Sequence, residues 1–137
     1  MIDLADIRIG NYVWYYDRNM EETAFQVEAI YEGYIYNSLL PLSKLPADKV
    51  HPLILDLNLL HQFGFIKGDP EYGESPEVYS LKYSYKDSVH ILYRNETFQP
   101  LVLVEQLQHP YGRPIVHVHQ LQNLYHALTR DELEIFE

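Results

Sequence analysis

Short stretches rich in β-branched and aromatic residues dominate residues 1–50 of the chain. Residues 7–15 form the first stretch, which a Gly10-Asn11 pair interrupts at a place suited to a turn or bulge. Residues 25–30 alternate apolar and polar side chains with period two, which predicts a strand with one buried face. Glu32-Gly33 then predicts a tight turn into a strand at residues 34–36.

Two further segments complete this N-terminal part. The apolar residues 39–42 predict another strand, and residues 44–49 predict a loop. Several short strands joined by tight turns are typical of small barrels. We therefore predict an SH3-like β-barrel over residues 1–50.

Two later segments show helical spacing. Residues 57–63 predict a short helix, with Asp56 as its N-cap and Gly64 just past its end. An apolar stripe predicts a longer C-terminal helix through Val118, Leu121, Leu124, Tyr125 and Leu128. Residues 129–132 match the capping-box pattern and predict one last turn containing Leu133, Ile135 and Phe136.

The clearest hairpin lies between these helices. Residues 78–85 alternate with period two, Lys86-Asp87 is the predicted turn, and residues 89–93 return as the second strand. Residues 101–104 predict a third strand. The fold class is therefore α+β, with the barrel packed on an antiparallel sheet and the two helices. Residues 51–137 form the second part, and a core shared with the barrel is expected because each part alone is small.

Composition and charge narrow the classes of function. The 137 residues include ten Lys and Arg against twenty Asp and Glu, for a net charge of −10. This balance argues against a protein that binds nucleic-acid phosphates, which needs a basic surface. The absence of cysteine excludes disulfides, zinc-thiolate sites and a thiol nucleophile. No long apolar run or basic leader is present, so we expect a cytoplasmic protein without a membrane span or signal peptide.

Three strings of the sequence resemble those of one protein family. They lie at residues 7–13, 51–65 and 118–133. They are similar to the "RIGNxV" start, the "LxxFGF" middle and the "HQLQNLYxALTGxEL" end of a group of short proteins from gut bacteria, their phages and mobile elements. The resemblance implies a link to phages or mobile elements and no known activity. Arg130 stands where the family has glycine, so the helix-ending glycine is missing and the two C-terminal helical turns are expected to run together.

Histidines offer one candidate chemistry. His117 and His119 are two residues apart, and His90 or His109 could supply a third nitrogen ligand to a catalytic metal. This alternative makes the protein a histidine-based, metal-dependent hydrolase. The other interpretation, which we favour, is that these histidines have structural hydrogen bonds, because no established ligand spacing is present. No cofactor is therefore predicted.

The most distinctive polar segment of the sequence lies at the start of the predicted C-terminal helix. A polar row at helical spacing is formed by His119, Gln122, Asn123 and His126. Such a row could recognise a peptide or a base edge. The alternative, which we favour, is that it ties the helix start to the neighbouring sheet through amide hydrogen bonds.

Aromatic residues offer a binding face. The chain has thirteen tyrosines, and a period of two places Tyr12, Trp14 and Tyr16 on one side of a strand. Aromatic faces of small barrels bind extended or proline-rich peptides, although tyrosine is also a good residue for packing half-exposed sheets. No phosphate-binding loop or nucleophile-elbow motif is present, and the serines stand in unremarkable contexts.

These observations favour a non-catalytic, cytoplasmic module that binds an unidentified protein. The binding residues would be the aromatic face or the polar row. The metal-dependent hydrolase is the alternative, and a nucleic-acid adaptor is a weaker one because of the negative charge. Self-association through an exposed strand edge is also possible.

Overall fold

The chain divides into two compact units in the computed structural model, which describes residues 2–85, 87–104 and 107–135. The first unit combines the chain up to Ile54 with His117–Glu132, and the second combines Leu55–Val116 with the C-terminal residues. Both contain antiparallel sheet and helix, so the α+β prediction is confirmed.

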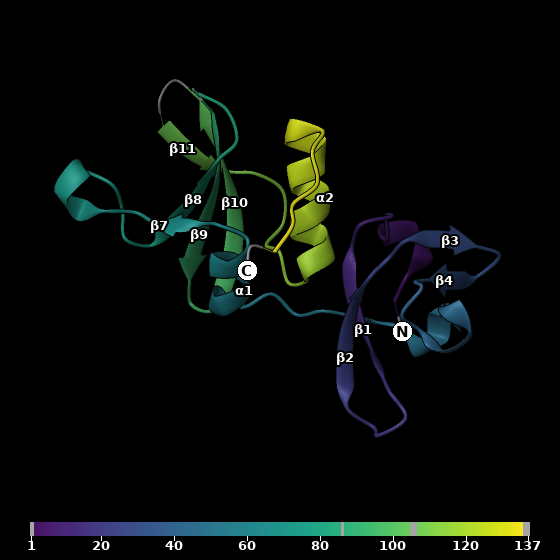
Figure 1. The fold of residues 1–137 in the computed structure, drawn as a ribbon. Coiled ribbons are helices and arrows are strands. Elements are labelled where there is room, and N and C mark those ends of the chain that lie inside the picture. Colours follow the sequence, from purple (N-terminus) through teal and green to yellow (C-terminus); the bar gives the residue numbers. More distant parts are fainter. Residues whose placement is uncertain (1, 86, 105–106, 136–137) are drawn as a thin grey trace. The chain divides into compact units, whose positions relative to one another are not determined.

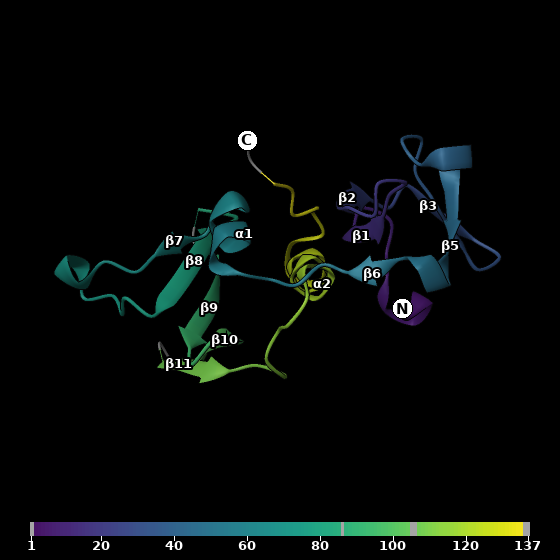
Figure 2. The ribbon, with the colours of Figure 1, turned by 90° about the horizontal axis from the view of Figure 1, so that it is seen from below.

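The first unit contains two three-stranded antiparallel sheets (Figures 1 and 2). In one sheet the order is β2 (Glu22–Gln26), β1 (Tyr12–Tyr16) and β6 (His51–Pro52). In the other it is β3 (Ala29–Tyr31), β4 (Tyr34–Tyr36) and β5 (Lys44–Pro46). A 3-10 helix, η1 (Leu4–Asp6), precedes β1, and two others, η2 (Pro41–Ser43) and η3 (Ala47–Lys49), join β4 to β5 and β5 to β6. Strand pairing among the described residues does not close the two sheets into a barrel.

The segment between β4 and β6 differs from its prediction. Residues 39–42 are not a strand, because Leu42 and Ser43 adopt left-handed backbone angles (φ 59° and 61°) and the chain forms η2 instead. Only Leu40 of this apolar run is buried, whereas Leu39 and Leu42 are exposed. The predicted loop at residues 44–49 is β5 followed by η3.

The core of the first unit follows the alternation of its strands. Val13 and Tyr15 of β1 face inward, together with Val27, Ile35 and Val50, which are almost completely buried. Since successive residues of a strand point to opposite faces, Trp14 and Tyr16 lie on the outer face of β1.

The second unit is built on a five-stranded antiparallel sheet (Figure 1). Its order is β11 (Leu107–Pro110), β10 (Thr97–Val104), β9 (Ser88–Arg94), β8 (Val78–Lys82) and β7 (Ile66–Lys67). The predicted hairpin and third strand are thus confirmed as β8, β9 and β10, although β8 ends at Lys82 and not at residue 85. Lys86 of the predicted turn lies outside the described residues.

Short helices accompany this sheet. The helix α1 (Leu57–Gln62) begins where predicted, because the Asp56 carboxylate accepts a hydrogen bond from the Leu59 N–H (2.8 Å). Its residue Leu60 and the following Phe63 are completely buried. A further 3-10 helix, η4 (Pro70–Tyr72), lies between β7 and β8.

The C-terminal helix α2 (Val118–Thr129) belongs to the first unit and is seen end-on in Figure 2. The prediction that it runs on into a further turn is wrong. Arg130 itself adopts the left-handed conformation (φ 64°) that a glycine would supply, and no helix follows in residues 131–135. Phe136 of the predicted turn lies outside the described residues.

Candidate binding groove

A groove of about 680 Å³ lies on the first unit, between the β1–β2 hairpin and the segment from β5 to β6. Its lining is mainly apolar and aromatic. The lining residues are Tyr15, Tyr16, Met20, Leu45, Pro46, Asp48, Lys49 and His51. Its volume is within the usual range for ligand-binding clefts.

Three rings are packed together at one side of this groove. Trp14 and His51 are opposite each other in the β1–β6 register, and their rings stack with centroids 4.4 Å apart. The ring of Tyr16 meets Trp14 edge to face at 5.0 Å, and the indole N–H of Trp14 donates to the Pro52 carbonyl (3.0 Å). These contacts fix the rings before any partner arrives, which lowers the entropy cost of binding.

The turn of the β1–β2 hairpin holds an exposed methionine at the groove. The Asp17 carboxylate accepts hydrogen bonds from the N–H groups of Asn19 (2.8 Å) and Glu21 (3.1 Å) and from the Thr23 hydroxyl (3.0 Å). The Glu21 bond contributes most to a pKa of Asp17 that is below its ordinary value. Within this turn Met20 adopts a left-handed conformation (φ 60°) and is 72% exposed. A methionine in this setting adapts readily to apolar partners.

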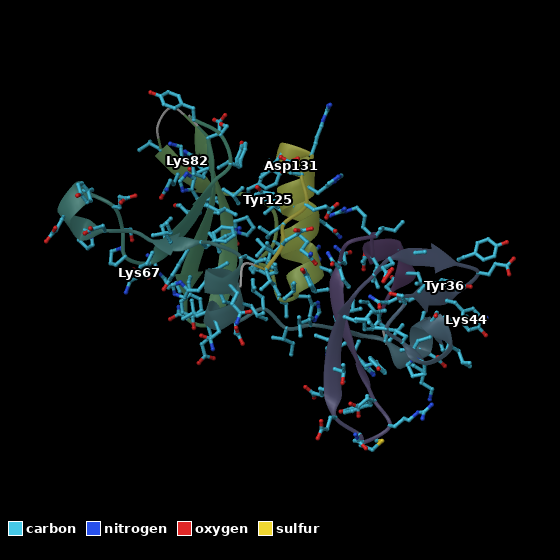
Figure 3. The ribbon with its side chains drawn as sticks, viewed as in Figure 1. Tyr36, Lys44, Lys67, Lys82, Tyr125 and Asp131 are labelled. Carbon is cyan, nitrogen blue, oxygen red and sulfur yellow. The ribbon has the colours of Figure 1, made fainter. Side chains whose placement is uncertain are left out.

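Charge near the groove is predominantly negative. Asp48 is among the lining residues, and Asp17 and Glu22 flank Tyr16 in sequence and in register. Lys49 is the cation in the lining. The nearby Lys44 lies over the ring of Tyr34 instead (4.6 Å) and next to Tyr36 in Figure 3.

The predicted aromatic face is only partly accessible. Tyr12 and Trp14 are half-buried, whereas Tyr16 is 49% exposed and lines the groove. Sequence reasoning found this face from its period of two, but it missed Met20 and His51. Met20 lies in a turn and His51 in a two-residue strand, so neither residue belongs to a segment long enough to show a strand or helix periodicity.

Two residues of the predicted polar row, Gln122 and Asn123, make hydrogen bonds within the first unit. Gln122 is completely buried; its Oε1 accepts from the Tyr12 N–H (2.8 Å) and its Nε2 donates to the Gly10 carbonyl (3.0 Å). The Oδ1 of Asn123 accepts from Asn11 (2.9 Å) and its Nδ2 donates to the Asp6 carbonyl (2.9 Å). His126 is half-buried near the end of α2.

The candidate metal ligands belong to different units: His117 and His119 to the first, and His90 and His109 to the second. His119 is 4% exposed with no hydrogen bond at Nδ1, and its ring stacks on that of His117 at 5.5 Å. Burial lowers the pKa of both histidines, and for His119 the neighbouring His117 adds to the shift. In the second unit, His90 is bonded to Ser80 and His109 lies on β11. Within the described residues no three His, Cys, Asp or Glu side chains form a group that could hold a metal ion.

No helix in the described part of the chain is long and apolar enough to cross a membrane. We compared the chain with protein-family models, curated proteins and solved structures, and none of the three comparisons found a match.

Proposed function

We propose that the first unit of this chain is a non-catalytic, cytoplasmic protein-interaction module whose groove binds an extended, cationic, proline-containing segment of another protein. The observation that carries the proposal is the preformed aromatic and apolar groove around Tyr16, Met20 and His51. Aromatic-lined grooves of this kind suit proline-rich segments, whose extended conformation costs little entropy to fix.

Charge supports the cationic character of the partner. Asp48, Asp17 and Glu22 stand at or beside the groove, and the chain as a whole carries a charge of −10. Exposed tyrosine rings also attract cations through their faces. A basic segment is therefore favoured over an acidic one both by long-range attraction and by contact. The same charge disfavours the nucleic-acid adaptor.

We also propose that β1 to β6 are an open relative of an SH3-like barrel. Only Val27 and Glu28 separate β2 from β3, so one stretch of chain contributes to both sheets. In addition, β1 pairs with both β2, the next strand along the chain, and β6, the last strand of this part. In a closed barrel the first strand would likewise pair with the next strand and with the last. This connectivity supports an SH3-like strand order, although the strand pairing does not close the two sheets into a barrel.

The resemblance to short proteins of bacteria, phages and mobile elements is likewise retained as a proposal. Its start and end strings contact each other here: Arg8 and Asn11 are hydrogen-bonded to Asn123, and Arg8 forms an ion pair with Glu132. The middle string contributes the buried Leu60, Phe63 and Phe65. In this chain the strings therefore serve the architecture, and they indicate no activity.

Selection of peptides from a random display library, with the full chain as bait, tests the groove. We expect enriched sequences to contain proline together with arginine or lysine. A synthetic peptide of the consensus sequence is then titrated while the fluorescence of Trp14, the single tryptophan, is recorded. Because Trp14 contacts both Tyr16 and His51, binding in the groove should change its emission.

Matched variants locate the binding. Tyr16→Ala and Met20→Ala should each weaken binding about tenfold, ~1.4 kcal/mol, as expected for central contacts. Tyr31→Ala is the control, since Tyr31 is a similarly exposed tyrosine of β3 outside the groove lining. Enrichment of acidic peptides, or equal loss in the control, would contradict the proposal. So would a dimer in sedimentation that Tyr16→Ala dissociates, because the groove would then be filled by a second copy.

A further inference from the structure

The second unit contains a cavity of about 390 Å³ that the proposed peptide-binding function does not use. It is lined by the loop before β8 and by residues of the strands β8, β9 and β11. Its lining includes the polar residues Glu74, Ser80, His90 and Gln108 and the apolar residues Val78 and Leu107.

A hydrogen-bonded serine and histidine stand in this cavity. Ser80 and His90 are directly opposite each other in the antiparallel register of β8 and β9. The Oγ of Ser80 lies 2.8 Å from the Nδ1 of His90, and both residues are half-buried. Because the two side chains project from paired strands of the sheet, their mutual geometry is fixed by the backbone.

The surroundings favour the neutral form of the His90 imidazole, which is the form that can act as a base. Burial lowers the pKa of His90, and the charge of Glu74 opposes this shift only in part. A neutral ring whose proton is on Nε2 has a free electron pair on Nδ1, directed at the serine hydroxyl. In this arrangement Ser80 is the donor and His90 the acceptor.

We propose that Ser80 is a nucleophile activated by His90, and that the cavity is an acyl-transfer site for small, uncharged or cationic carboxylic esters. The Val78 and Leu107 walls suit a short acyl group, and the Gln108 amide is a donor of the kind that stabilises an oxyanion. The Glu74 carboxylate disfavours anionic substrates.

The reaction proceeds in two balanced steps. As Ser80 Oγ forms a bond to the ester carbonyl carbon, its proton moves to His90 Nδ1, and the carbon–oxygen bond to the alcohol breaks as the alcohol leaves with that proton. Water then attacks the acyl-serine and gives a proton to His90 Nδ1. The Oγ–carbon bond breaks, the carboxylic acid leaves, and the proton returns to Ser80.

Acetylation by p-nitrophenyl acetate tests this site in the full-length protein. We expect a burst of p-nitrophenolate and one added acetyl group, located on Ser80 by peptide mass spectrometry. Ser80→Ala should remove both the burst and the adduct. His90→Gln should slow acylation by about 10²–10⁴-fold, the usual contribution of a general base. Ser84→Ala is the matched control, because Ser84 is bonded to the Asp87 carboxylate and is exposed.

Several results would show that Ser80 is not the nucleophile. An adduct on lysine or on another serine, or a burst that survives in Ser80→Ala, overturns the proposal. Absence of both a burst and an adduct in folded wild-type protein also overturns it, because Ser80 would then not be an activated nucleophile. Circular dichroism of each variant confirms that it is folded, and Tyr16→Ala, which disrupts the peptide groove, should acetylate normally. The two proposals can thus fail separately.

Discussion

Replacing Gln122 with alanine should destabilise the first unit substantially. The side chain of Gln122 is completely buried between α2 and the start of β1. It joins residues that are 110 or more positions apart in the chain: Oε1 accepts from the Tyr12 N–H, and Nε2 donates to the Gly10 carbonyl. Truncation removes both bonds at once.

The expected loss of stability follows from the two hydrogen bonds that the substitution removes. The part-buried Tyr12 N–H loses this acceptor, and such a loss costs about 1–3 kcal/mol. The Gly10 carbonyl is less affected because it also accepts from the Gln26 amide (3.1 Å). Loss of a buried methylene adds about 0.8 kcal/mol. Together these effects predict a fall of about 2–4 kcal/mol in the free energy of unfolding.

Urea denaturation followed by Trp14 fluorescence measures this quantity, because the single tryptophan lies in β1 of the same unit. Gln122→Met, which keeps the side-chain length but not the hydrogen bonds, should lose most of the same stability. Gln120→Ala is the control: Gln120 is exposed and its side-chain oxygen accepts from the His117 N–H (2.9 Å), so a loss of about 1 kcal/mol or less is expected. Equal losses in Gln122→Ala and Gln120→Ala would refute the reasoning.

Three further predictions concern single residues. Arg130→Gly should raise the free energy of unfolding by about 0.5–1 kcal/mol, since φ is 64° there, whereas Arg130→Ala should give no gain in the same urea experiment. Burial lowers the pKa of His119 below 6.5, so the folded state binds fewer protons than the unfolded state. Stability should therefore be complete above about pH 6.5 and decrease as the pH falls through the lowered pKa, and His119→Gln should flatten this dependence in unfolding measured from about pH 7.5 to 5. Phe63→Ala should cost about 3–5 kcal/mol because the ring is completely buried, and far-ultraviolet circular dichroism should detect the loss; an unchanged midpoint would contradict the assigned core.

Local signals in the sequence were sufficient for some elements. Asp56 and Gly64 delimit α1 because capping depends on a few adjacent residues. Glu32-Gly33 forms the predicted turn between β3 and β4 for the same reason. By contrast, the apolar run at residues 39–42 indicated a strand, although only Leu40 is buried. Hydrophobicity alone does not tell which residues of such a run will find a core.

The Ser80–His90 pair shows why sites across strands are harder to predict. A two-residue turn at Lys86-Asp87 would place Ser80 opposite Tyr93. Instead β8 ends at Lys82 and pairs there with Ser88, which brings Ser80 opposite His90. A shift of register exchanges every cross-strand partner, so the length of the loop decided whether the pair existed. Sequence reasoning singled out His90 as a possible metal ligand but gave Ser80 no role, because the contact between them depends on the register.

The most distinctive strings of this sequence are tied to its architecture. Arg8, Asn11, Gln122 and Asn123 form one hydrogen-bonded network within the first unit. Substitutions in this network should lower stability and leave the peptide affinity of the remaining folded protein unchanged. Substitutions at Tyr16 should do the opposite, because its ring lines the groove and is half exposed. The residues of these distinctive strings therefore specify the fold, and the residues that decide the partner must be sought on the surfaces between them.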